Sequence, residues 1–123
     1  MFRAYGLHFC LNVIAGPRGT PGCVLIRALE PTRGLLAMAA RRGSRAGPLA
    51  LTSGPAKLTQ GLAISLRENG ADLTRGRLTI HLPDSPARFA VVIGPRVGIS
   101  RARDRRLRFW IRGNRHVSRP RPA

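Results

Sequence analysis

A strict alternation of side-chain type near the beginning of the chain constrains its fold more than any other feature. The segment YGLHFCLNVI, residues 5–14, places its members on two opposite faces when extended. A period of two predicts a β-strand. One face carries mostly apolar side chains and the other is mixed: Tyr5, Leu7, Phe9, Leu11 and Val13 on the first, His8, Cys10, Asn12 and Ile14 on the second.

The next two segments predict a hairpin. AGPRGTPG, residues 15–22, has two prolines and three glycines and predicts a loop. CVLIRALE, residues 23–30, predicts a second strand, and antiparallel pairing with the first is the simplest topology.

The remainder of the chain mixes helix and strand signals. Helices are predicted over residues 33–42 and 53–64, the second with Ser53 as its cap and a proline in its first turn. Further strands are predicted over residues 77–82, 88–94 and 106–113. We therefore expect one α+β domain, a largely antiparallel curved sheet with two inserted helices, and we expect this domain to be incomplete.

The charge of the chain is one-sided. Its 123 residues include 22 basic and 5 acidic side chains, for a formal net charge of +17, and every basic residue except Lys57 is arginine. GC-rich codon usage explains part of this arginine count, but such a surface still attracts a polyanion, most simply nucleic acid. Binding of this kind weakens steeply as salt is added.

Cysteines, metals and membranes set further limits. Cys10 and Cys23 would be out of register in the predicted hairpin, so we read both as buried thiols in a reducing compartment, the cytoplasm. Two cysteines and three scattered histidines have no zinc-ligand spacing. No apolar run approaches the ~20 residues that span a bilayer, and the polar residues within 5–14 argue against a signal peptide.

Five motifs, in order, resemble the alkyladenine (3-methyladenine) DNA glycosylases over nearly the whole chain. They are YGLHFCLNV, VLIRALEP, SGPAKLTQGLAI followed by NGADLT, PRVGIS, and FWIRGNRHVSRP. The resemblance implies a monomeric base-excision repair hydrolase acting on double-stranded DNA with alkylated purines. Such enzymes flip the damaged nucleotide out of the duplex and hydrolyse its N-glycosidic bond with water, using no metal and no organic cofactor.

The resemblance also implies roles for single residues. Asn12 matches an asparagine of the base pocket that excludes guanine, and Phe2 falls where the family stacks an aromatic ring on the flipped base. Arg27 matches the arginine that helps to hold the attacking water, and the backbone carbonyl of Val97 matches a second contact to it. The expected DNA contacts are the wedge residue Tyr5, its supports Leu7 and His8, and the phosphate contacts Lys57 and Arg96.

The chain departs from the family at the general base. In the family a catalytic glutamate lies upstream of the matched motifs, and Glu30 matches a different family glutamate. We therefore expect residues 1–113 to be the C-terminal part of an alkylbase DNA glycosylase domain, with residues 114–123 as a loose basic tail and the C-terminal arginines on a solvated face. Little activity is expected, because loss of a general base costs about 10²–10⁴ in rate.

Two other readings stay open. A non-catalytic, basic DNA-binding protein could keep the wedge and the floor of the pocket without the chemistry. An arginine-rich, ribosome-associated protein would rest on the charge alone.

Overall fold

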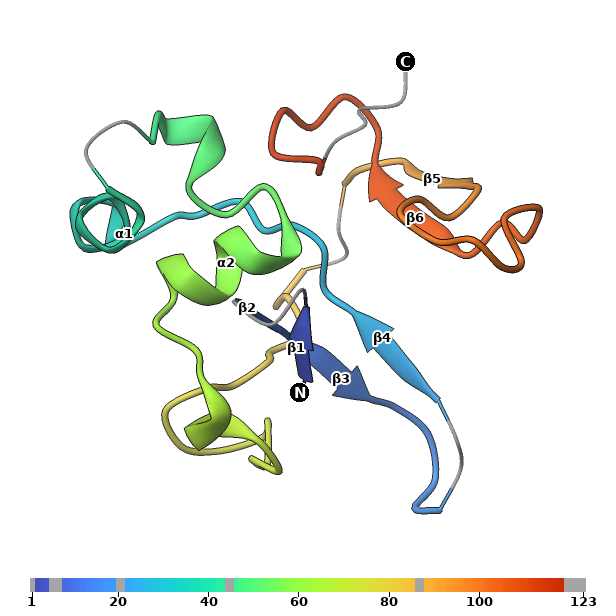
Figure 1. The fold of residues 1–123 in the computed structure, drawn as a ribbon, viewed down its shortest axis with the longest axis horizontal. Coiled ribbons are helices and arrows are strands. Elements are labelled where there is room, and N and C mark those ends of the chain that lie inside the picture. The colour runs from blue at the N-terminus through green and yellow to red at the C-terminus, as the bar shows by residue number, and fades with distance from the viewer. Residues whose placement is uncertain (1, 5–7, 20–21, 44–45, 86–87, 119–123) are drawn as a thin grey trace.

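The computed structural model describes residues 2–4, 8–19, 22–43, 46–85 and 88–118. It confirms the predicted α+β class with antiparallel pairing. Within these residues the strands form three separate two-stranded sheets, in place of one continuous sheet. Figure 1 shows helices α1 and α2 on one side of the molecule and the β5–β6 pair on the other.

The strand predicted over residues 5–14 is interrupted at Leu11. Strand β2 (His8–Cys10) pairs with β1 (Phe2–Ala4), which the alternation did not predict, and β3 (Asn12–Ile14) pairs with β4 (Cys23–Leu25). Cys10 and Leu11 are consecutive and both buried. Simple alternation across residues 5–14 is therefore wrong at this point, because both neighbours enter the interior.

The β3–β4 hairpin has the predicted antiparallel register. Asn12 lies opposite Leu25 and Ile14 opposite Cys23. The pairing continues one step further with a hydrogen bond of 3.0 Å from the Ile26 N–H to the Leu11 carbonyl. Cys10 and Cys23 are not bonded to each other, as expected, but only Cys10 is buried. The prediction that Cys23 is buried is wrong, because the end of the hairpin at Ile14 and Cys23 extends into solvent.

The C-terminal strands are confirmed in shortened form. Strand β5 (Val91–Gly94) pairs antiparallel with β6 (Arg108–Ile111), and Val92 lies opposite Trp110. Residues 77–82 are described and contain no strand, so that prediction is wrong. There the Ile80 N–H instead donates to the Leu73 carbonyl at 2.8 Å, which closes a loop.

Both predicted helices are present with shorter bounds. Helix α1 spans Leu35–Arg42 and helix α2 spans Pro55–Gly61, while short 3₁₀ turns occupy Pro48–Ala50 (η1) and Leu66–Glu68 (η2). The cap of α2 is Gly54 without a side-chain hydrogen bond, so Ser53 is not the cap that the sequence predicted. Pro55 occupies the first turn, as its missing N–H allows.

Helix α2 is the centre of the small core. It packs against both α1 and β2. Leu58 is fully buried, and it forms one cluster with Leu11 and Ile64. The Thr59 hydroxyl, also on α2, donates to the Phe9 carbonyl of β2 at 2.9 Å. This core fixes the base of the β3–β4 hairpin, because Leu11 joins the two strand pairs.

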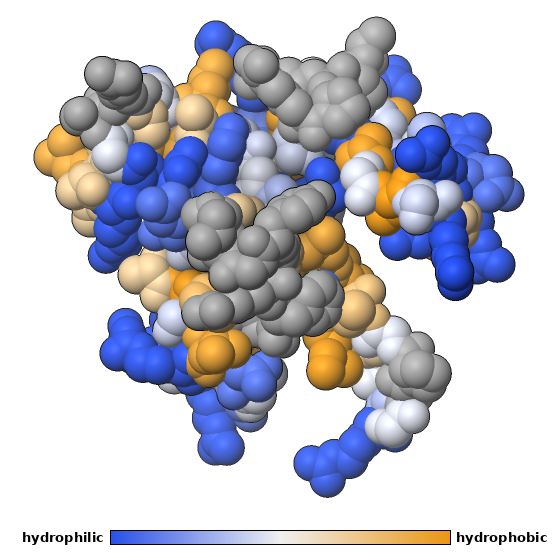
Figure 2. Space-filling model, viewed as in Figure 1, coloured by the Kyte–Doolittle hydropathy of each residue, from blue (hydrophilic) through white to orange (hydrophobic). Residues whose placement is uncertain are grey.

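A large share of the apolar side chains lies outside this core. Figure 2 shows apolar surface interspersed among strongly hydrophilic regions. The exposed apolar residues include several on or beside β3, β4 and β6: Ile14, Val24, Leu25, Leu29, Leu107 and Phe109.

No described helix has the length and apolar character needed to cross a bilayer. No group of three or more potential ligands from histidine, cysteine, aspartate and glutamate comes together in the part of the chain that the structure describes.

Candidate functional site

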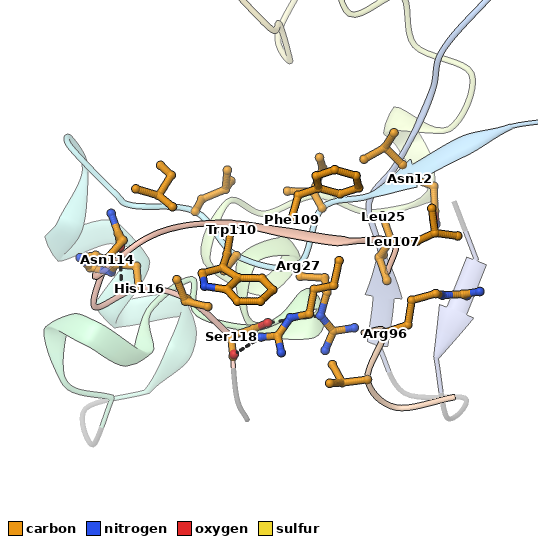
Figure 3. A pocket seen from close by; sticks show the side chains of 18 of the residues that line it. Asn12, Leu25, Arg27, Arg96, Leu107, Phe109, Trp110, Asn114, His116 and Ser118 are labelled. Atoms are coloured by element: carbon orange, nitrogen blue, oxygen red, sulfur yellow. Dashed lines mark hydrogen bonds between the residues drawn. The ribbon is translucent and has the colours of Figure 1, made fainter. Parts of the chain in front are cut away.

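The main cavity of the described structure has a volume of about 840 Å³ and lies between the β4 segment and β6 (Figure 3). Residues 23–30 form one wall, and residues 107–111 form the other. Residues 96–99 and 114–118 close parts of its margin. The cavity therefore combines segments that are far apart in the sequence, and its size is within the usual range of ligand sites, about 300–1,000 Å³.

Two arginines converge on one serine at this cavity. The Arg27 Nε–H donates to the Ser118 hydroxyl oxygen at 3.2 Å, and an Nη2–H of Arg108 donates to the Ser118 carbonyl at 2.7 Å. Ser118 is 3% exposed and Arg108 is 8% exposed. Figure 3 shows the Arg27 side chain directed toward Ser118, with dashed lines for the hydrogen bonds at this serine.

Burial perturbs both arginines. Burial lowers the pKa of Arg27, and the nearby Cys10 thiol partly offsets this effect. Burial also lowers the pKa of Arg108, and the positive charge of Arg27 lowers it further. Two cations that repel each other in a partly dry cavity favour an anionic or electron-rich ligand.

Asn12 lies at the β3 end of the same cavity. Its amide N–H donates to the Cys10 carbonyl at 3.5 Å, and the Cys23 thiol lies 3.9 Å from its amide oxygen. Both contacts are long, so they hold the amide weakly and leave it able to bond with a ligand.

The remaining predicted residues fall into three groups. Arg96 and Val97 line the cavity beside Arg27 and Asn12, with Arg96 exposed. Lys57 lies on α2, away from the cavity lining, and its aliphatic chain covers Gly54. The wedge residue Tyr5 and its support Leu7 lie outside the described residues, while Phe2 and His8 are placed only by their strands, β1 and β2.

The sequence interpretation missed the contribution of the C-terminal segment. Residues 106–118 were expected to present solvated arginines and then a loose tail, yet Arg108, Trp110, His116 and Ser118 all line the cavity. The guanidinium of Arg108 also lies 5.3 Å from the centre of the Trp110 ring. The period of two on β6 was the available signal, because it puts Arg108 and Trp110 on one face.

One acidic side chain stands among the described residues that line the cavity. Glu30 is exposed and accepts a hydrogen bond of 2.9 Å from the Asn114 amide through Oε2. This bond fixes the carboxylate at the rim, next to the turn that follows β6.

The family of the chain follows from comparison with known proteins. The family model described as methylpurine-DNA glycosylase matches residues 1–115. The chain belongs to the methylpurine-DNA glycosylase family. Among curated relatives named "Putative 3-methyladenine DNA glycosylase", one from Methanoculleus marisnigri is 48% identical over 122 residues, 97% of this chain and 63% of the relative.

Two further relatives with the same name agree. A Rhodopseudomonas palustris protein is 44% identical over 99% of this chain and 58% of the relative, and a Carboxydothermus hydrogenoformans protein is 43% identical over 96% and 62%. The chain thus spans about three-fifths of the length of the curated relatives that it matches. The resemblance stated from the sequence is confirmed at the level of the DNA glycosylase family.

Proposed function

We propose that the chain is a DNA repair protein that binds duplex DNA containing alkylated purines and receives a flipped purine in the cavity between β4 and β6. In the complete glycosylase the reaction is hydrolysis of the N-glycosidic bond. This chain is a truncated or weakly active form of that enzyme. Its place of action is DNA in the cytoplasm. Its net charge of +17 supports attraction to the phosphate backbone.

The observation that carries this proposal is the meeting of separately predicted residues at one cavity. Asn12 comes from β3, Arg27 follows β4, and Arg96 and Val97 follow β5, yet all four line the same space. A volume of about 840 Å³ holds a purine and part of its sugar and phosphate. The amide of Asn12 would then contact the edge of the base, and Trp110 and Phe109 would provide aromatic surface.

Arg27 is suited to position water and phosphate. With Nε directed to Ser118, both terminal amino groups of the guanidinium are available for a ligand in the cavity. A water molecule held between these groups and the Val97 carbonyl would attack the anomeric carbon of the damaged nucleotide. Neither a metal nor an organic cofactor enters this proposal.

The position of the acidic residue at the cavity favours a second candidate function. The acidic residue that lines the described cavity, Glu30, is held at the rim by Asn114. A cavity that binds a purine without a base next to Arg27 would recognise damage without cleaving the bond. The second candidate is therefore a non-catalytic DNA-binding protein.

One experiment separates the two functions. Purified chain is incubated with two duplexes that differ only by one hypoxanthine or 3-methyladenine, and both base release and binding are measured over a range of salt concentrations. Base release supports the glycosylase. Tighter binding to the damaged duplex without release supports the non-catalytic protein, whereas equal binding to both duplexes without any base release would contradict both candidates.

Two variants test the proposed contacts. Tyr5→Ala removes the proposed wedge and is expected to weaken binding to the damaged duplex more than to the intact one, by a factor of about ten. Equal weakening on both duplexes would remove Tyr5 from that role. Asn12→Ser is expected to relax discrimination against guanine lesions, and unchanged selectivity would contradict its place in the base pocket.

A further inference from the structure

We propose that Ser118 is a positioning residue that sets the direction of the Arg27 guanidinium in the cavity, and that Arg108 holds Ser118 in place. This inference rests on the proposed function, since it assigns a cause to the orientation of the arginine that would hold water and phosphate. It gives a role to the segment after β6, which matches no predicted site residue.

The geometry divides the donors of Arg27 between two tasks. Its Nε–H points to the Ser118 hydroxyl at 3.2 Å, across a sequence separation of 91 residues. Guanidinium is planar, so fixing Nε fixes the plane in which the two Nη groups lie. Arg27 lines the cavity, and Figure 3 shows its side chain beside Ser118, so the two Nη groups can serve a ligand there.

Ser118 is itself held through its own backbone carbonyl. Its carbonyl accepts the 2.7 Å bond from Arg108, whose guanidinium lies 5.3 Å from the Trp110 ring centre. Arg108 is 8% exposed and Ser118 is 3% exposed, so water competes little with these contacts. Arg108 thus connects β6 to Ser118, and Ser118 connects to Arg27 on the opposite wall.

The like charges of Arg27 and Arg108 repel each other, and the tether at Ser118 holds the Arg27 guanidinium in the cavity against this repulsion. The serine presents two acceptors on one residue, the hydroxyl to Arg27 and the carbonyl to Arg108. The guanidinium groups of Arg27 and Arg108 are thus both bonded to Ser118, through different atoms.

The direct test is the Arg27 side chain in solution. In nitrogen-15 NMR spectra of the whole chain, Ser118→Ala should speed the exchange of the Arg27 Nε–H with water by about tenfold and increase its mobility. Ser118→Thr keeps a hydroxyl and should retain slow exchange. Ser100→Ala, the same change at an exposed serine outside the cavity lining, is the control and should have no effect.

The functional test uses the same variants on the damaged and intact duplexes. Ser118→Ala should reduce the binding preference for the damaged duplex about fivefold while intact-duplex binding is unchanged, and Ser118→Thr should restore it. In Arg27→Ala the added Ser118→Ala should have no further effect, because the serine acts through the arginine.

The two failures are distinguishable. If Arg27→Ala loses the preference but Ser118→Ala changes neither it nor the Nε–H exchange, the positioning role is overturned and the proposed function stands. If Arg27→Ala keeps the full binding preference for the damaged duplex, the proposed function fails. Slow exchange of the Arg27 Nε–H in the wild-type chain would then show that the Ser118 contact is structural only, which also overturns the positioning role. Additive losses in the double variant would likewise contradict it.

Discussion

Gly94 of β5 lies directly beneath the indole ring of Trp110 on β6. A Cβ atom built on Gly94 would meet the ring carbon Cη2 at 2.5 Å and Cζ3 at 2.8 Å. The ring can pack on the neighbouring strand only because this position has no side chain. Since Trp110 also carries the cation–π contact with Arg108, the glycine determines where one wall of the cavity stands.

Gly94→Ala is therefore expected to lower the free energy of unfolding by about 1–3 kcal/mol, as overpacking does. The free energy of unfolding is measured by urea titration, with the fluorescence of Trp110, the single tryptophan of the chain, as the signal. Gly47→Ala is the matched control: nothing lies within 4 Å of its Cβ position, and its φ of −69° suits alanine. Equal stability of the two variants would show that the indole moves without cost.

Leu58→Ala should destabilise the fold most among single apolar truncations. Leu58 is fully buried at the centre of the core cluster, and removing such a side chain costs about 2–5 kcal/mol. Because this core is small, the cooperative thermal transition should broaden or disappear in circular dichroism. Leu66→Ala, at a leucine that is 56% exposed, should leave the transition in place. A cooperative transition of wild-type midpoint in Leu58→Ala would contradict the assigned core.

Arg96→Gln tests the phosphate contact at the cavity mouth. One lost phosphate contact should reduce the slope of log K against log salt concentration by about 0.9 on duplex DNA. Fluorescence anisotropy at several salt concentrations measures this slope. Arg75→Gln is the control, because the Arg75 charge already pairs with Asp72 at 3.3 Å. A slope change of the same size in both variants would show a general charge effect and no contact at Arg96.

Acid should loosen the turn that follows α2. The Ser65 backbone N–H, with help from Arg67 and Arg77, lowers the pKa of Glu68 below its ordinary value, and the Thr74 hydroxyl and N–H do the same for Asp72. A lowered pKa in the folded state means that the contribution to stability is present above the unfolded pKa and is lost as pH falls through the folded one.

The measurement is the thermal midpoint at pH 7 and at successively lower pH, below the ordinary pKa values of about 4.5 and 3.8. The wild-type midpoint should fall in that acid range. Glu68→Gln, which cannot titrate but can still accept from Ser65, should show a smaller fall. An identical acid profile in both proteins would remove Glu68 from the explanation.

Local patterns predicted local structure well in this chain. Proline and glycine in residues 15–22 marked the hairpin loop, good helix formers marked α1, and a proline in the first turn marked α2. The antiparallel pairing of β3 and β4 was predicted from the succession of strand, loop and strand. The pattern failed at two places: Leu11 turns into the core beneath α2, and within residues 77–82 the Ile80 N–H bonds to the nearby Leu73 carbonyl instead of to a strand.

Some residues of the candidate site were named from the sequence, and others were found only in the structure. Motif resemblance named Asn12, Arg27, Arg96 and Val97, and they do line one cavity. It did not name Ser118 or Arg108: the period of two on β6 places Arg108 on the face of Trp110, but it does not say that this face meets the segment around Arg27. That information lies in contacts between residues separated by 91 positions, which no local window contains.

The order of residues by itself determined the family, the α+β class, the strong positive charge and the positions of most turns. These properties depend on composition, short-range periodicity and motif order, each of which is readable along the chain. Only the tertiary structure decided which arginines are withdrawn from water and which atoms receive their hydrogen bonds. The physical reason is that desolvation and side-chain hydrogen bonding depend on which distant segments pack together, so they exist only once the chain has folded.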